Sequence, residues 1–465
     1  MKVTGVLLLT LSAVTPASSV FVIVPGVIQM AGTGAFIAMA VAACIALAMA
    51  LVYAELSSAY PVAGGEYSLM GHTLGPFVGF VFMVSNVVGS TMGPAVLSLG
   101  AGAYVNAIWP GVPTVPLALG IIGASMLLGV LNIRLNAWVT GAFLAVELLA
   151  LIILGALGFM HARRPISEFL LHPMVVTHGH FAPASVASIG LATAVAVFAY
   201  NGFGAAVCFS EEMHEAPRRV SRAILLALGL TIAFEFIPMA AVLIGAPDLK
   251  AMIASERPFS DFVLVAGGRT LDTVVSLGVA LAIVNAVIAI VLINARFYFS
   301  SARDRVWHGG VNALLTRLHS RFDSPWVATM LAGATGMATC FVPLHVLLVF
   351  TGAGVVVMYA LLCLAVLAGR ITGSTSHGVY RMPLFPLAPA VALAALIYVL
   401  YANWIDPDVG RPSLIVDLAI MTVAAPYYVM QRRRRGAAWF MSAPRRRTMS
   451  PPLTGASEIP QEAAG

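Results

Sequence analysis

Two short segments in apolar surroundings carry residue types that could bind a zwitterion. They read Thr15-Pro16-Ala17-Ser18-Ser19 and Phe198-Ala199-Tyr200-Asn201-Gly202-Phe203. Proline lacks an amide hydrogen and its ring clashes with the preceding turn, so a helix cannot run straight through Pro16. The Asn201-Gly202 pair permits positive φ angles. Each segment therefore predicts a helix break that frees backbone amides and carbonyls.

The freed groups would hold opposite ends of a zwitterion. The half-helix beginning near Val20 directs the positive end of its dipole into the first break, where a carboxylate would be stabilised. Carbonyls freed at the second break would accept hydrogen bonds from an ammonium group. The alternative, that both breaks are ordinary kinks of membrane helices, stays open.

The stretches that would position these breaks are long enough to cross a bilayer. Hydrophobic residues make up 60% of the chain and charged residues 9%, against a usual charged share of about a quarter. A helical span needs about 20 apolar residues. We therefore expect an all-α integral membrane protein, with twelve transmembrane helices near 3–30, 34–58, 74–105, 113–131, 136–160, 185–210, 223–245, 271–299, 326–342, 344–368, 385–403 and 413–430.

Basic residues predict the orientation of these spans. With twelve spans and a cytoplasmic N-terminus, 19 of the 25 Lys and Arg residues would lie on the cytoplasmic side. This imbalance follows the positive-inside rule, and it places both termini in the cytoplasm. The basic charge is thus a topology signal and not a nucleic-acid-binding signal. The tail from 436 to 465 is expected to be basic and then disordered.

Irregular backbone at membrane depth is tolerated only where protein or a water-filled cavity supports it. A pair of interrupted helices in corresponding halves of a chain is typical of a transporter's substrate site. Ser90 in the third expected helix and Asn285 in the eighth are further candidates to face such a site. Packing and interhelical hydrogen bonds are the commoner role of such residues.

Two carboxylates are expected deep inside helices. Glu147 lies 13 residues past Arg134, and Glu235 lies 13 residues past Arg222, which is about 20 Å into a helix at 1.5 Å per residue. A charged carboxylate at such depth costs roughly 2.5–3.5 kcal/mol. Burial favours the protonated form, so either residue could take up and release a proton during transport. The alternative is a protonated carboxyl that bonds a neighbouring helix.

Several longer motifs resemble one family. Tyr53-Ala54-Glu55-Leu56-Ser57-Ser58-Ala59-Tyr60-Pro61-Val62-Ala63-Gly64-Gly65-Glu66-Tyr67 resembles a signature of the amino acid–polyamine–organocation transporters, the amino acid permeases. The segments 198–203, 210–219 and 295–304 resemble the family's sixth-helix break, the segment after it, and the loop after the eighth helix. The resemblance covers roughly residues 3–430.

The resemblance implies a transporter domain over 1–435, built as a five-plus-five inverted repeat with discontinuous first and sixth helices. The repeats would cover about 3–160 and 185–369, and two extra helices about 385–430. The substrate would sit between the two broken helices, and alternating access would come from rocking of one bundle against the other. Candidate gate charges at the cytoplasmic face are Glu55, Glu66, Glu211 and Arg218.

Two departures from the family pattern affect the expected substrate. The first break has proline where many members are rich in glycine, which removes one amide from the carboxylate cradle. Gly204 stands where many members carry an acidic residue after the sixth-helix break, which weakens the case for a strongly cationic substrate.

The leading hypothesis is secondary active transport of an amino acid across the inner (cytoplasmic) membrane, driven by protons or by exchange. A polyamine or another organic amine is the alternative substrate. No cofactor or metal site is expected, because the four cysteines are not closely paired and no fitting ligand spacing occurs. An intramembrane enzyme is disfavoured because the spans contain no Gly-x-Ser-x-Gly sequence or similar catalytic pair.

Overall fold

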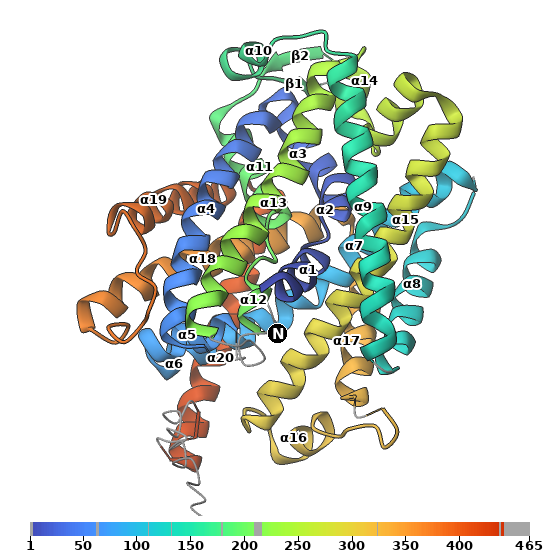
Figure 1. Cartoon of the computed structure of the whole chain (residues 1–465). Helices are drawn as coiled ribbons and strands as arrows, with labels where there is room; N and C mark the ends of the chain where they lie inside the picture. Colours follow the sequence, from blue (N-terminus) through green and yellow to red (C-terminus); the bar gives the residue numbers. More distant parts are fainter. Residues whose placement is uncertain are drawn as a thin grey trace, which may run out of the picture.

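The computed structural model describes residues 3–61, 65–109, 111–131, 133–177, 180–208, 216–322, 324–436 and 439–440 as an almost entirely helical bundle (Figure 1). The first half comprises α1 Val3–Val14, α2 Pro16–Ser18, a π-helical turn Ser19–Ile23, α3 Val24–Ala31, a 3-10 turn Gly32–Gly34, α4 Ala35–Ala59, α5 Glu66–Thr73, α6 Pro76–Ser90, α7 Met92–Ile108, α8 Thr114–Val130, α9 Ile133–Met160 and α10 Ile166–Leu171.

A two-stranded antiparallel sheet connects the halves, with β1 Met174–Thr177 paired to β2 His180–Pro183 and Met174 opposite Pro183. The second half comprises α11 Val186–Ala199, α12 Ala205–Cys208, α13 Ala216–Gly245, α14 Leu249–Ala254, α15 Pro258–Arg303, α16 Gly309–Leu315, α17 Trp326–Thr339, α18 Leu344–Thr372, α19 Leu387–Ile405 and α20 Gly410–Arg435. Gly268 interrupts α15 with a φ of 82°.

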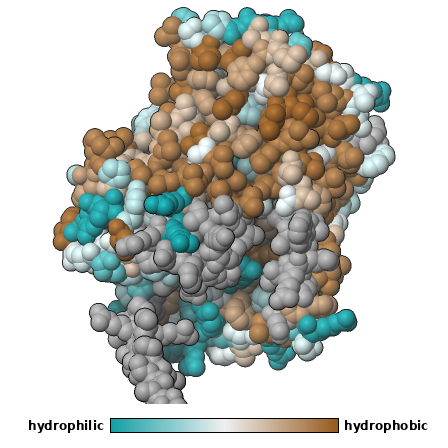
Figure 2. All heavy atoms as spheres, viewed as in Figure 1, coloured by the Kyte–Doolittle hydropathy of each residue, from teal (hydrophilic) through white to brown (hydrophobic). Residues whose placement is uncertain are grey.

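The surface is that of a multi-pass membrane protein. Within the described residues, eight helical segments are long and apolar enough to cross a bilayer, and α8 and α11 are shorter apolar helices. Figure 2 shows a broad apolar band across the middle of one face, with hydrophilic side chains concentrated toward the two ends. Many large apolar side chains are exposed, among them Leu149, Ile152 and Val423, as expected where the solvent is lipid. Twelve crossings stay a prediction.

The helices approach one another closely where small residues meet. A Cβ added to Gly158 on α9 would lie 2.6 Å from the carbonyl oxygen of Ala241 on α13, and one at Gly352 on α18 would lie 2.8 Å from that of Ala194 on α11. Helices in a bilayer associate through such van der Waals packing, because lipid is as apolar as their side chains. These contacts fix the helices around the two broken ones.

Both predicted breaks are present in the fold. Thr15 adopts a left-handed conformation (φ 51°, ψ 67°) between α1 and α2, which is strained for a β-branched residue. Pro16 therefore begins the next helical segment, where its missing amide costs little. In the second half, α11 ends at Ala199, and residues 200–204 form turns before α12. Gly202 there has a φ of 121°.

Candidate functional site

A cavity of about 610 Å³ lies between the two breaks and three long helical stretches. Its volume falls within the usual range of sites for small molecules. One side is lined by Val14, Thr15 and Ser19 from the first break. The second break contributes Phe198, Ala199, Asn201, Gly202 and Gly204. The two sequence-predicted breaks therefore border one common space.

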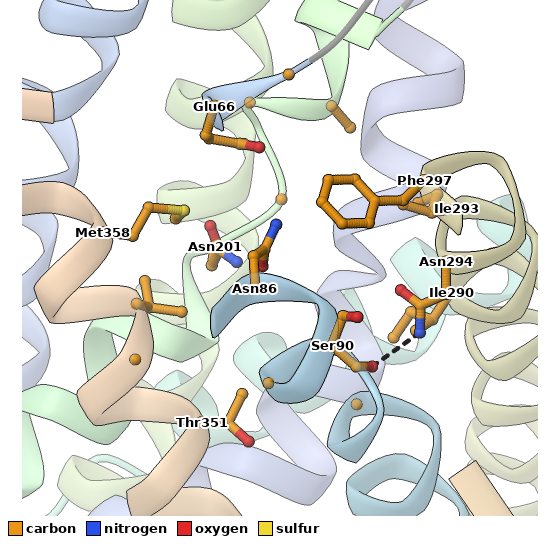
Figure 3. Close-up of a pocket in the computed structure, with 18 of the residues that line it drawn as sticks. Glu66, Asn86, Ser90, Asn201, Ile290, Ile293, Asn294, Phe297, Thr351 and Met358 are labelled. Carbon is orange, nitrogen blue, oxygen red and sulfur yellow. Dashed lines mark hydrogen bonds between the residues drawn. The ribbon is translucent and has the colours of Figure 1, made fainter. Parts of the chain in front are cut away.

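The remaining walls are formed by residues that recur at helical spacing along α6, α7, α15 and α18. From α6 and α7 come Phe82, Ser85, Asn86, Gly89, Ser90, Gly93 and Leu97; from α15 come Ile290, Ile293, Asn294 and Phe297; from α18 come Phe350, Thr351, Gly354, Val355 and Met358. Figure 3 shows Asn86, Asn201 and Met358 near one another, with Asn294 donating to the carbonyl oxygen of Ser90 at 2.8 Å. Isolated amide and hydroxyl groups on an apolar wall are the arrangement that orients a small ligand.

The two breaks are joined directly. Ser19 Oγ donates a hydrogen bond to the carbonyl oxygen of Ala199 at 3.1 Å. A Cβ added to Gly202 would lie 3.1 Å from Val14 Cα, so the second break packs against the end of α1. A movement of one broken helix would therefore displace the other.

Asn201 at the second break and Glu66 at the start of α5 each accept a hydrogen bond from a tyrosine. Tyr359 on α18 donates from its hydroxyl to Asn201 Oδ1 at 3.2 Å, and Tyr53 on α4 donates to Glu66 Oε1 at 3.1 Å. The Tyr53 and Tyr359 rings also pack on Phe203, with centroids 5.5 and 6.2 Å away.

Glu66 begins α5, outside the candidate spans, and lines the cavity. Burial raises the pKa of Glu66 above its ordinary value by removing water from the charged form.

Exposed polar residues form a mouth at one end of the cavity. Arg296 and Arg303 line it there, and Arg303 is 59% exposed and pairs with Asp304 at 3.7 Å. At the opposite end, Phe21 packs on Tyr104 and Phe259 with ring centroids 5.5 and 5.8 Å apart. Arg303 ends α15, and α16, which follows it, lies at the end of the bundle opposite the sheet β1–β2 (Figure 1).

The two deep carboxylates are not among the residues that line the cavity. Glu147 on α9 and Glu235 on α13 are both 0% exposed. Glu147 neighbours Asn285 on α15, and Glu235 neighbours Ser19 and Tyr200. No hydrogen bond of ordinary geometry satisfies either carboxyl among the described residues. Glu235 thus lies next to one residue of each break.

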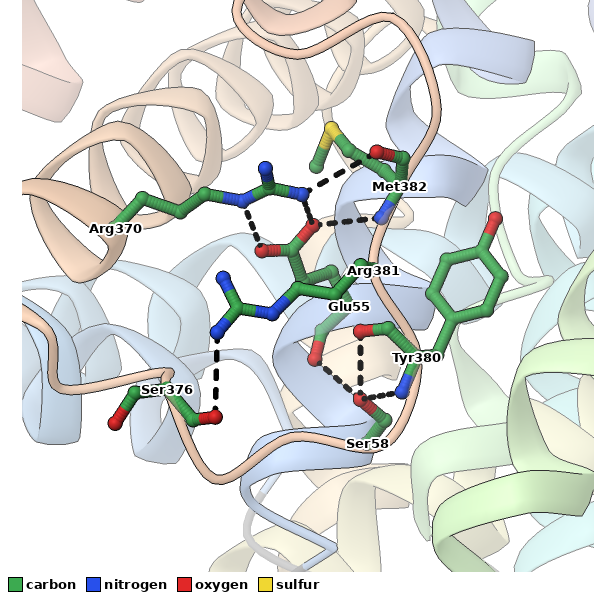
Figure 4. A network of polar contacts seen from close by, with 7 residues as sticks. All are labelled: Glu55, Ser58, Arg370, Ser376, Tyr380, Arg381 and Met382. Carbon is green, nitrogen blue, oxygen red and sulfur yellow. Dashed lines mark hydrogen bonds and ion pairs between the residues drawn. The ribbon is translucent and has the colours of Figure 1, made fainter.

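Glu55 forms a short, two-pronged ion pair with Arg370. Arg370 on α18 donates from Nε and Nη2 to its two carboxylate oxygens at 2.6 and 2.7 Å, and the Met382 amide donates to Oε2 at 2.9 Å (Figure 4). The Arg370 guanidinium also lies 4.1 Å from the Phe385 ring centroid. Glu55 therefore joins the end of α4 to α18 and to the chain that follows it.

The remaining predicted site residues either do not line the cavity or lie outside the described residues. Pro16, Ala17, Ser18, Tyr200, Phe203 and Asn285 are buried and outside the cavity lining. Glu211 lies outside the described residues, as does the side chain of Arg218. Roles for all of them stay predictions.

Polar lining residues that were not singled out from the sequence include Ser85, Thr351, Asn294 and Asp417. Asp417 carried a usable signal, since it is a lone carboxylate within an apolar run, as Glu147 is. Within the described residues, no three His, Cys, Asp or Glu side chains come together to hold a metal.

Comparison with known proteins identifies similar chains. The amino acid permease family model matches residues 2–425. An uncharacterized transporter of Mycobacterium tuberculosis is 30% identical over 335 residues, 71% of each chain. The branched-chain amino acid permease of Bacillus subtilis is 24% identical, covering 81% of this chain and 82% of its own. The methylthioribose transporter of the same bacterium is also 24% identical, covering 88% and 89%.

Proposed function

Because this chain belongs to the amino acid permease family, we propose that it is a secondary active transporter that carries an amino acid by alternating access. One observation supports this most: two helix breaks border a single cavity and are joined by the Ser19–Ala199 hydrogen bond. The relatives are transporters, which supports a non-enzymatic role.

The binding mode follows from the breaks. Thr15 and Ser19, the two residues at the first break's turn that line the cavity, would meet the substrate's carboxylate, aided by the helix dipole. Carbonyls near Gly202 would accept hydrogen bonds from its amino group. Ser19, Asn201 and Ser90 supply the side-chain polar groups of the same space.

Coupling is assigned to the buried carboxylates. Glu235 adjoins both breaks, and Glu147 adjoins α15 through Asn285. A carboxyl at this depth is costly when charged, so its proton state would respond to any movement that admits water. Glu55, Glu66, Glu211 and Arg218 are proposed to stabilise the cytoplasmic gate.

We further propose the arrangement of the whole chain. The transporter domain covers 1–435 as a five-plus-five inverted repeat with two extra helices. It crosses the inner membrane twelve times, and both termini lie in the cytoplasm. In this proposed arrangement, the cavity mouth near Arg296 and Arg303 would face the cytoplasm, as the positive-inside rule favours, and the cavity would be open to the inside.

An organic amine is the second candidate substrate. The carboxylate of Glu66 lines the cavity and bonds to Tyr53, and it could hold a cationic group without a carboxylate partner at the first break. A polyamine would satisfy this chemistry. An amino acid remains the first choice because both breaks line the cavity.

Uptake into proteoliposomes tests the proposal. Labelled amino acids and polyamines are offered with and without an inward proton gradient, to the native protein and to Glu147→Gln. We expect gradient-stimulated amino acid uptake that is lost in Glu147→Gln but kept in Glu168→Gln, a control at an exposed position on α10.

Other uptake results would change the assignment. Uptake that ignores the gradient and needs internal substrate would make the protein an exchanger and return Glu147 to a structural role. Uptake of polyamines alone would select the second candidate, and uptake of neither class would contradict both.

A further inference from the structure

A carboxylate that the proposed binding and coupling residues do not include reaches the cavity from α20. Asp417 is 4% exposed, lies in a candidate membrane span and lines the cavity. Ser85 Oγ on α6 donates to its Oδ1 at 3.3 Å. Its Oδ2 is buried and has no hydrogen-bond partner among the residues that the structure describes. Ionisable residues at such depth are rare and mark functional sites.

The unpartnered oxygen lies beside a glycine of α18. A Cβ added to Gly354 would lie 3.6 Å from Asp417 Oδ2, and Gly354 itself lines the cavity. Thr351 lies one helical turn earlier on the same face of α18 and also lines the cavity. Asp417, Thr351 and Asn86 thus place a carboxylate, a hydroxyl and an amide in the lining of one cavity.

The charges of the lining divide into two regions. Arg296 and Arg303 belong to the exposed mouth, whereas Glu66 and Asp417 are the acidic residues of the lining. No ion pair that the described residues form involves Asp417. A buried carboxylate without a cationic partner is strongly disfavoured, so a cation supplied by the ligand would complete this part of the site.

We propose that Asp417 and Ser85 form a subsite for a second cationic group of the transported molecule. This inference rests on the proposed function, which assigns the first amino group to the breaks. The molecule would then be an amino acid with a cationic side chain or a diamine, because both carry a second protonated amine. Asp417 would hold that amine through Oδ2, and Ser85 would fix the carboxylate's orientation through Oδ1.

Uptake by the full chain in proteoliposomes tests the subsite, with labelled lysine, putrescine and leucine as probes. We expect native protein to favour lysine or putrescine over leucine. Asp417→Asn should raise the half-saturating concentration of the favoured cation roughly 10- to 100-fold, the effect of losing one charge-assisted hydrogen bond, and should leave leucine unchanged. Whether lysine or putrescine is affected identifies the source of the amine.

Two further variants keep the test decisive if Asp417→Asn fails to fold. Gly354→Leu would cover Oδ2 from α18 and should weaken uptake of the same cation. Asp408→Asn changes an exposed aspartate before α20 and should have no effect. If leucine is carried as well as the cations, or all three probes are affected equally, the subsite is refuted while the transport proposal stands. Uptake of no amino acid or amine would contradict both.

Discussion

At the scale of single residues, the site depends on two backbone conformations that ordinary helices do not contain. Thr15 is left-handed at 51° and Gly202 has a φ of 121°. A strained non-glycine conformation costs about 1–3 kcal/mol and persists only where surrounding structure enforces it. The packing of Gly202 against Val14 and the Ser19–Ala199 hydrogen bond supply that enforcement. The strain is therefore located where the substrate is proposed to bind.

Gly202→Ala should remove transport, because the new Cβ would meet Val14 Cα at 3.1 Å in a conformation that alanine disfavours. We expect uptake near background and a loss of about 1–3 kcal/mol in stability, measured as a lower Tm in detergent. Gly229→Ala on α13 is the matched control, since a Cβ there meets nothing within 4 Å. Equal behaviour of both variants would contradict this account of the break.

Glu66→Gln should change how stability depends on pH. Burial raises the folded-state pKa of Glu66, so the folded protein binds its proton more tightly than the unfolded chain does. Unfolding free energy then falls as pH rises from the ordinary value of 4.5 through the raised pKa. The Glu66→Gln variant lacks this loss, so its Tm should rise relative to that of the native protein as the pH increases across this range.

The matching measurement is a Tm series in detergent from pH 4 upward, with the exposed Glu168→Gln as a control for the substitution itself. A difference in Tm between Glu66→Gln and the native protein that stays constant with pH would show that Glu66 is not stabilised in its protonated form.

At the scale of helices, the Glu55–Arg370 ion pair joins two helices of the bundle. Glu55 is 1% exposed and Arg370 19%. The pair ties α4 to α18, and the Met382 amide adds the chain before α19. Because α18 also supplies Thr351 and Tyr359 to the site, the pair fixes the position of one wall.

Arg370→Ala should lower stability by about 3 kcal/mol, because removing one partner leaves the other charge buried. The exposed Arg303–Asp304 pair at 3.7 Å is the matched comparison, and Arg303→Ala should cost about 0–1 kcal/mol. Thermal unfolding of the two variants measures the difference. Equal losses would show that the Glu55 pair contributes no more than a surface pair.

The breaks were predictable because their causes are local. Proline at 16 and Asn-Gly at 201–202 act on their own turns, and both breaks are confirmed by the structure. The π-helical turn after Ser18 was not predicted, since it depends on tertiary packing rather than on a residue preference. The sequence could not decide whether a polar side chain points into the cavity or toward another helix. Ser90 lines the cavity, whereas Asn285 lies next to Glu147. Helix rotation decides this, and packing of distant helices sets the rotation.

At the scale of the whole molecule, the described state is asymmetric. Aromatic packing of Phe21, Tyr104 and Phe259 closes one end, and the cavity continues to Arg303 at the other. The alternating access proposed above requires the reverse arrangement as well, with Phe21 and Tyr104 separated. Phe21 lies in the π-helical turn directly after the first break, so a movement of the broken helix would open that end.

Protection of a single cysteine by substrate tests the central claim, that the transported molecule binds between the breaks. In a cysteine-free background, Thr351→Cys in the cavity is labelled with a thiol reagent, and Thr372→Cys on an exposed part of α18 serves as control. We predict that a transported substrate slows labelling at position 351 but not at position 372. Unchanged labelling at position 351 with saturating substrate would place the binding site elsewhere and contradict the account.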